Sequence, residues 1–275
     1  MTIMQKIIKY LAIAFAIFLI VTIISTILAV VFSISAILGL KSNIESEMKT
    51  EYINTINFEN NNINKLDIDI AHANLTIKTG KNIRLETNCT SVKYKEEDSN
   101  LKIEEKNNIW FKKQNQINLI LYIPEETELK DANLIAGTGK IIIENLNTKK
   151  LKLKLGAGKT QIHKITVTEG CEIDSGAGET DILSGSIKNL DLDMGIGNLK
   201  LTSYLIESNE IDAGIGNLQI NLQGEKNLYK VKVDKGLGNI TSEEKEIINE
   251  EIIGNGNNYV EINGGIGNID INFNK

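Results

Sequence analysis

Two stretches of the chain, residues 190–201 (LDLDMGIGNLKL) and 209–220 (NEIDAGIGNLQI), repeat one pattern 19 residues apart. In both, apolar and polar residues alternate up to a Gly-X-Gly triplet, and the alternation resumes after it. A period of two is typical of β-strands, in which successive side chains point to opposite faces. The pattern therefore predicts a strand, a corner at the glycines and a second strand.

The same triplet recurs throughout the chain after Pro124. Its first glycines are separated by 19, 20, 19, 19, 22 and 29 residues. Glycine permits the positive φ or the close backbone approach that a corner stacked on its neighbour requires. The expected structural corners are Gly137, Gly139, Gly156, Gly158, Gly176, Gly178, Gly195, Gly197, Gly214, Gly216, Gly236, Gly238, Gly265 and Gly267.

Every residue three positions before a first corner glycine is apolar: Leu134, Leu153, Ile173, Leu192, Ile211, Val233 and Ile262. A unit of this size cannot bury its own apolar face, so successive units must stack as parallel coils. The predicted fold is all-β, a single-stranded parallel β-helix or β-solenoid with coils of 19–20 residues. A degenerate first coil is expected at residues 66–77, where Ala71 and Ala73 replace the corner glycines.

Residues 10–40 contain no charged side chain. A bilayer core needs roughly 20 helical residues, so this run predicts one N-terminal transmembrane helix. A cleaved signal peptide is the competing interpretation, because Lys6 and Lys9 precede the run and small residues surround Ala36. The apolar part of a signal peptide usually has about 7–15 residues, however, which favours an uncleaved anchor.

The expected organisation follows from this span. Residues 1–9 form a short cytoplasmic N-terminus, 10–40 the transmembrane helix, 41–55 a polar stalk and 56–275 an extracytoplasmic β-solenoid. The two lysines before the span favour a cytoplasmic N-terminus. The protein is thus expected in the cell membrane as a single-pass protein, with its C-terminal domain outside the cytoplasm.

Composition excludes several function classes. The formal net charge is −6 and only 5% of residues are aromatic. Both values disfavour nucleic acid as a partner, because phosphate backbones need basic surfaces and single strands need stacking platforms. Cys89 and Cys171 are too few for a disulfide framework. Cys171 occupies a position expected to face the core, so it is interpreted as packed and unreactive.

No motif predicts an enzyme, a cofactor or a nucleotide. Gly156-Ala157-Gly158-Lys159-Thr160 imitates the end of a phosphate-binding loop, but Leu153 stands where that loop needs glycine. His72 and His163 lie far apart and have no catalytic or metal-ligand spacing around them. The lysines at 149, 150, 152, 154 and 159 alternate with leucines, which indicates a solvated strand face more than a basic binding patch.

Four acids occupy the position two residues before a first corner glycine: Asp174, Asp193, Asp212 and Asp234, with Asn263 following. On consecutive coils they would form a ladder with a spacing of about 4.8 Å. The favoured interpretation is structural, with each Asp accepting a backbone hydrogen bond in an Asx-turn at its own corner. A divalent cation or cationic partner bridging the ladder is the second possibility. A catalytic acid cluster, as in polysaccharide-cleaving β-helices, is the third.

The order of these elements resembles a known family. Leu121-Tyr122-Ile123-Pro124-Glu125, followed by Gly-X-Gly strands and by Gly264-Gly265-Ile266-Gly267-Asn268-Ile269, resembles the bacterial putative-adhesin family of cell-envelope β-solenoids. The resemblance covers residues 56–273 and implies a parallel β-helix behind an anchor or signal peptide. It implies no catalytic or ligand-binding residues.

The expected function is therefore that of a membrane-anchored, non-catalytic adhesion, scaffold or binding module. Its expected partners are the membrane, through the single span, and an unidentified protein or surface polymer. The alternative is a membrane-tethered component of an envelope-stress sensing or regulatory system.

Overall fold

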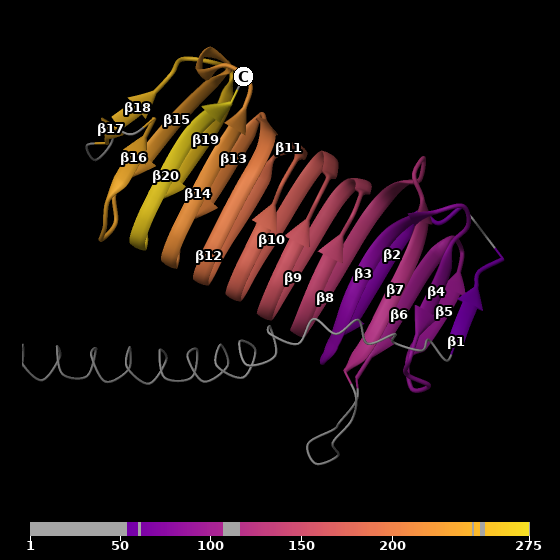
Figure 1. Cartoon of the computed structure of the whole chain (residues 1–275). Helices are drawn as coiled ribbons and strands as arrows, with labels where there is room; N and C mark the ends of the chain where they lie inside the picture. Colours follow the sequence, from indigo (N-terminus) through magenta and orange to yellow (C-terminus); the bar gives the residue numbers. More distant parts are fainter. Residues whose placement is uncertain (1–53, 60–61, 107–115, 244, 248–250, 275) are drawn as a thin grey trace, which may run out of the picture. The chain divides into compact units, whose positions relative to one another are not determined.

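The computed structural model describes residues 54–59, 62–106, 116–243, 245–247 and 251–274 (Figure 1). They all belong to one compact unit of the chain, Glu51–Lys275. The described residues form one 20-stranded sheet and a single 3-10 turn at Lys226–Leu228. The prediction of an all-β solenoid is confirmed.

The strands follow one another along the chain as β1 (Asn54–Asn57), β2 (Lys65–Ile70), β3 (Ala73–Gly80), β4 (Arg84–Thr87), β5 (Lys93–Glu97), β6 (Asn100–Glu105), β7 (Ile117–Pro124), β8 (Glu128–Ile143), β9 (Leu146–Ile162), β10 (Ile165–Ile182), β11 (Gly185–Lys188), β12 (Leu190–Ile206), β13 (Ser208–Asp212), β14 (Ile215–Gln223), β15 (Tyr229–Asp234), β16 (Ile240–Ser242), β17 (Lys245–Glu246), β18 (Glu251–Ile253), β19 (Asn258–Asn263) and β20 (Ile266–Asn274).

The central coils are long strands that bend at their Gly-X-Gly corners and stack in parallel (Figure 1). β9 pairs with β8 on one side and with β10 on the other, and Gly158 aligns with Gly139 and Gly178. The register shifts once, between Val167 and Gly170 in β10, where the coil contains 20 residues instead of 19. Corners therefore lie above one another along one edge of the solenoid.

The interior contains the predicted apolar column. Leu153, Ile173, Leu192 and Ile211 align on neighbouring strands, and each side chain is buried. Alternate residues such as Lys152 point outward, as strand periodicity requires. Burial of these aliphatic ladders is the main stabilising contribution to the unit.

The coil order in space differs from the order in sequence at the C-terminal end. β13 and β14 pair with β19 and β20, which pair in turn with β15 and β16. The last coil of the chain, β19–β20, therefore lies between two coils that precede it (Figure 1). The expectation that successive units stack in sequence order is wrong here, because residues 243–257 let the chain pass the β15–β16 coil and return.

At the N-terminal end, too, the order of the coils in space differs from their order in the sequence. The first coil, β2–β3, pairs with β8 on one side and with β6 and β7 on the other. Antiparallel strands border both end coils: β4 pairs with β7, β5 with β6, β18 with β15 and β17 with β16. They cover parts of the strand edges, which would otherwise present unpaired backbone groups to other chains.

The expected transmembrane helix at 10–40 lies outside the described residues. Within the described part of the chain, no helix is long and apolar enough to cross a membrane. Most of the expected stalk at 41–55 also lies outside it, and β1 begins at Asn54, inside that stalk.

Candidate functional site: the acidic face and the corner edge

The corner edge is the line of stacked Gly-X-Gly triplets. Gly216 has a φ of +133°, a conformation that residues with a side chain rarely adopt. A Cβ on Gly216 would also overlap the carbonyl oxygen of Gly197 on the preceding coil, and a Cβ on Gly195 would overlap that of Gly176. The bare backbone of one corner therefore packs directly on the next, which is why the triplet repeats.

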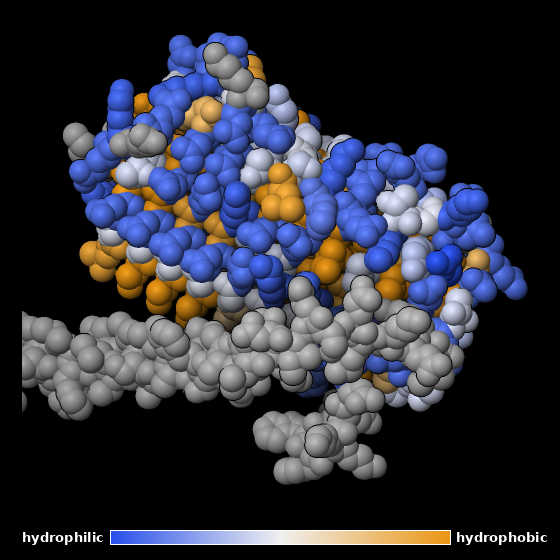
Figure 2. All heavy atoms as spheres, in the orientation of Figure 1, coloured by the Kyte–Doolittle hydropathy of each residue, from blue (hydrophilic) through white to orange (hydrophobic). Residues whose placement is uncertain are grey.

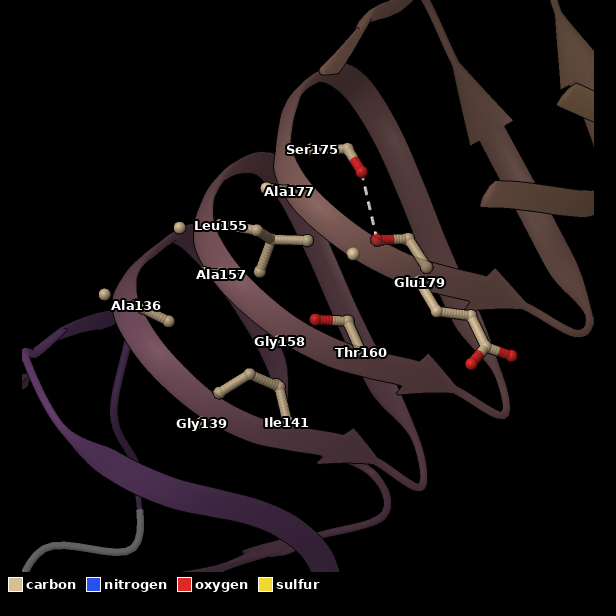
Figure 3. Close-up of a pocket in the computed structure, with 14 residues that line it drawn as sticks. Ala136, Gly139, Ile141, Leu155, Ala157, Gly158, Thr160, Ser175, Ala177 and Glu179 are labelled. Atoms are coloured by element: carbon tan, nitrogen blue, oxygen red, sulfur yellow. Dashed lines mark hydrogen bonds between the residues drawn. The ribbon is translucent and has the colours of Figure 1, made fainter. Parts of the chain in front are cut away.

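A small cavity lies inside this edge (Figure 3). Its volume is about 20 Å³, enough for about one water molecule, and Leu155, Ala157 and Thr160 contribute to its wall. Ser175 Oγ and Thr180 Oγ1 lie 3.0 Å apart beside it. Lys159 does not reach into a phosphate cradle, because its Nζ pairs with Glu179 Oε1 at 2.9 Å. The loop at Gly156–Thr160 is thus a packed corner.

The aspartate ladder differs from its expected form. Asp174, Asp193 and Asp212 align on neighbouring coils, but Asn263 lies between Asp212 and Asp234. The four acids are therefore not on consecutive coils. The exchanged position of β19–β20 inserts a neutral amide into the ladder.

The structure does not contain the expected Asx-turns. Among the described residues, no corner N–H donates to the carboxylate of Asp174, Asp193, Asp212 or Asp234. Corner N–H groups instead donate to carbonyl oxygens of neighbouring coils, as from Ile266 N to Gly214 O at 2.8 Å. Because the parallel ladder uses the amides, the carboxylates stay on the outer surface.

The carboxylates of this ladder lie in a wider acidic face. We define the acidic face as the outward rows formed by Glu172, Asp174, Asp191, Asp193, Glu210, Asp212 and Glu261. Lysines border it at both ends: Lys152 Nζ lies 2.7 Å from Glu172 Oε1, and Lys232 Nζ lies 2.7 Å from Glu261 Oε1. The predicted lysine-rich strand face is thus paired with neighbouring acids.

The centre of the acidic face has uncompensated negative charge. Partial burial, followed by the charges of Asp212, Asp191, Asp174 and Glu172, raises the pKa of the Asp193 carboxyl. At the borders the opposite holds, because Lys152 lowers the pKa of Glu172 and Lys232 lowers that of Glu261. No group of three or more His, Cys, Asp or Glu side chains within the described residues is arranged to hold a metal ion.

The histidines and cysteines are not brought together. His72 lies at the corner of the first coil, with Nδ1 2.9 Å from Thr138 Oγ1, whereas His163 is exposed after β9. Cys171 is buried in the core, and burial raises the pKa of its thiol, which leaves it protonated and unreactive. Cys89 is half-buried near the N-terminal end.

The sequence analysis missed an apolar feature of the corner edge. The middle residue of the triplet is Thr138, Ala157 and Ala177 on the earlier coils, but Ile196, Ile215, Ile266 and Leu237 on the later ones. We call these four residues the aliphatic ridge. Figure 2 shows apolar side chains protruding along this edge over the C-terminal coils. The change from small to branched middle residues was the available signal.

The family model described as Toastrack DUF4097 matches residues 63–272. No curated protein matches the chain. The chain is similar to a putative cell adhesion protein from Clostridium sporogenes, with 17% identity, a TM-score of 0.39, and coverage of 80% of this chain and 98% of that one.

Two further solved structures are similar at comparable coverage. One is a putative adhesin from Bacteroides fragilis, with 14% identity, a TM-score of 0.46, and coverage of 79% and 96% of the two chains. The other is a putative lipid binding protein from Parabacteroides distasonis, with 14% identity, a TM-score of 0.35, and coverage of 79% and 96%. The family match itself spans far more than half of the chain, and the chain belongs to the Toastrack DUF4097 family.

Proposed function

We propose that the protein is a membrane-anchored, non-catalytic binding module that acts as an adhesion or scaffold element outside the cytoplasm. The observation that carries this proposal is the acidic face, in which seven carboxylates stand in straight rows on a rigid ladder of parallel strands. Fixed rows of one charge favour an extended partner that bears positive groups. A protein or a surface polymer of that kind is the proposed partner.

The fold supports binding by surface complementarity. The solenoid holds neighbouring coils about 4.8 Å apart, so side chains in one row keep a constant spacing over the whole face. Such a face recognises repeated groups on a partner without any movement of the backbone. The acids at its centre are left for a partner, since Lys152 pairs with the outer member Glu172, and Lys232 pairs with the outer member Glu261 and with Asp234 beside the face.

The anchor of the proposal is the uncharged run at residues 10–40. Lys6 and Lys9 before it favour an orientation in which the solenoid lies outside the cytoplasm. Carbonate-washed membranes from cells that express the full chain should retain it, and added protease should degrade the solenoid in cells stripped of their wall. Mass spectrometry of the extracted protein should find the original N-terminus. A new N-terminus near Ala36 or Ile37 would contradict the anchor.

Binding is tested with full-length protein in detergent and isolated cell envelopes. Retention should decrease with rising salt, because screening weakens charge–charge attraction. The double variant Asp191→Asn/Glu210→Gln should bind at least several-fold more weakly. A matched control, Asp181→Asn/Glu128→Gln, removes two charges outside the acidic face and should bind like wild type. Equal loss in both variants would show that net charge, and not this face, determines binding.

A further inference from the structure

Three of the four residues of the aliphatic ridge are exposed although they are bulky and apolar, and the fourth, Ile196, is half-buried. Ile215 is 39% exposed, Ile266 47% and Leu237 72%. Ile196 aligns with Ile215, Ile215 with Ile266, and Ile266 with Leu237, so the four side chains stand on four adjacent coils. Each stands between two glycines, so no neighbouring side chain on its own corner covers it.

Polar rows of different chemistry flank the two sides of the ridge. Three residues before each ridge position stand Asp193, Asp212, Asn263 and Asp234, on the side of the acidic face. Two residues after each stand Asn198, Asn217, Asn268 and Asn239, on the other side. The asparagines form a ladder, in which Asn217 Nδ2 donates to Asn198 Oδ1 at 3.0 Å and Asn268 Nδ2 to Asn217 Oδ1 at 3.3 Å.

We propose that the aliphatic ridge is a contact surface for a second copy of this chain, packed ridge to ridge with the two solenoids parallel. The two copies are related by a two-fold axis parallel to the direction in which the coils stack. This axis keeps the coils of both copies in the same order and sets each flank of one ridge beside the opposite flank of the other. Ile215 then meets Ile215 of the partner subunit, and the aspartate row of one copy lies beside the asparagine row of the other. Asparagine has two N–H donors, and the ladder uses one of them.

The flanking rows select this arrangement over an antiparallel one. An antiparallel two-fold axis would place aspartate row beside aspartate row, and like charges at short distance repel. Only a second solenoid repeats the spacing of the ridge, which favours a copy of the chain over an unrelated peptide.

The contact is small, which determines where it forms. Four ridge residues and their flanking rows are fewer than the roughly 20–30 residues a side of a standard stable interface. Pairing is therefore weak in dilute solution and becomes effective when both copies are held on one surface, where tethering raises their local concentration. This part rests on the proposed membrane anchor. A parallel pair also places both N-terminal ends on the same side, as one membrane requires.

Cysteine cross-linking in membranes tests the proposal on the full chain. The background is Cys89→Ser, with the buried Cys171 retained. Ile215→Cys, treated with a short bismaleimide, should give several-fold more dimer than the control Leu183→Cys, which is equally exposed (37%) on a different corner. Adding Ile266→Ser should reduce the dimer without lowering the melting temperature. Co-expressed Asp212→Cys and Asn217→Cys should cross-link to each other more than either does to itself.

Three outcomes would overturn the pairing. Equal dimer yields for Ile215→Cys and Leu183→Cys would remove its basis, and a dominant Asp212→Cys homodimer would show antiparallel packing. If Ile215→Cys forms no dimer but membranes shield it from a water-soluble maleimide, the ridge contacts lipid instead. Membrane retention is scored on the same samples. Retained protein without cross-links leaves the anchor standing and refutes the pairing, whereas cross-linked protein in the soluble fraction refutes the anchor and shows that the pairing does not need tethering.

Discussion

Asn263 donates a hydrogen bond from Nδ2 to Oδ1 of Asp212 at 2.7 Å, although the residues are 51 positions apart in the sequence. The contact exists because β19 pairs with β13 and separates that strand from β15. A neutral donor therefore stands where a strictly sequential stack would set Asp212 against Asp234. The exchanged coil relieves repulsion at this point of the acidic face.

Replacing that donor should destabilise the solenoid. Asn263→Asp removes a hydrogen bond and places a third carboxylate between Asp212 and Asp234, so we expect a loss of about 1–2 kcal/mol at pH 7. The loss should shrink as the pH falls through the carboxyl range near 4, because protonation removes the repulsion. Thermal melts of the variant and the wild type at pH 7 and pH 4 measure the loss of stability and its dependence on pH. Asn268→Asp, in the exposed asparagine row, is the control and should cost less.

Removing charge from the aspartate ladder should not destabilise the solenoid. Asp193→Asn/Asp212→Asn should leave the melting temperature at pH 7 unchanged or slightly raised. The raised pKa of Asp193 means that its protonation favours folding, so its stabilising contribution is present at acid pH and is lost as the pH rises through its folded-state pKa. Any gain in the variant should therefore be largest at neutral pH and vanish in acid.

The same double variant tests the cation interpretation of the ladder. Melting of the wild-type protein in millimolar calcium and in chelator should give the same midpoint within a few degrees. A few degrees corresponds to about 1 kcal/mol in a domain of this size. A calcium-dependent rise that disappears in the variant would establish a bridging cation.

The interior ladder should not tolerate a charge. Leu192 has no exposed surface and lies between Ile173 and Ile211. Leu192→Asp buries an unpaired carboxylate, and we expect a loss of about 4 kcal/mol, or roughly 10 °C in the melting temperature. Lys200→Gln, on an exposed position of the same strand, should change stability little. If Leu192→Asp melted at the wild-type temperature, the alignment of Leu192 with the interior column would be refuted.

Two glycines provide a matched test of the corner. Gly216→Ala combines a strained φ with overlap on the carbonyl oxygen of Gly197, so we expect a loss of about 2–4 kcal/mol. Gly170→Ala, at the register shift of β10, introduces a Cβ with no atom within 4 Å and should be nearly neutral. Chemical denaturation of both variants gives the comparison. Equal losses would mean that corner packing does not require glycine.

Sequence periodicity was sufficient for the solenoid and not for its coil order. Leu192 and Ile211 had to face inward because alternation fixes one face of each strand. The same alternation fits any neighbour equally well, since every coil offers the same apolar column. The long segments at 81–99 and 243–257 permitted the changes in coil order at the two ends. The length of a segment does not indicate to which coil the chain returns.

The candidate site was predicted less well for a related reason. Local chemistry around Asp193 favoured an Asx-turn, but the corner amides that such a turn needs are donors to the next coil. That competition is a property of the stack and cannot be derived from one repeat. The sequence predicted no role for Ile215 and Leu237, because a single corner does not reveal whether its middle residue meets another coil or the solvent.

The inserted position of the last coil has a mechanical consequence. In an ordinary stack, tension on the end of the chain peels off a terminal coil and breaks one ladder at a time. Here β19–β20 is held by β13–β14 on one side and by β15–β16 on the other. A pull on the chain beyond Phe273 must break two ladders together, so unravelling from that end should require more force than peeling an exposed coil.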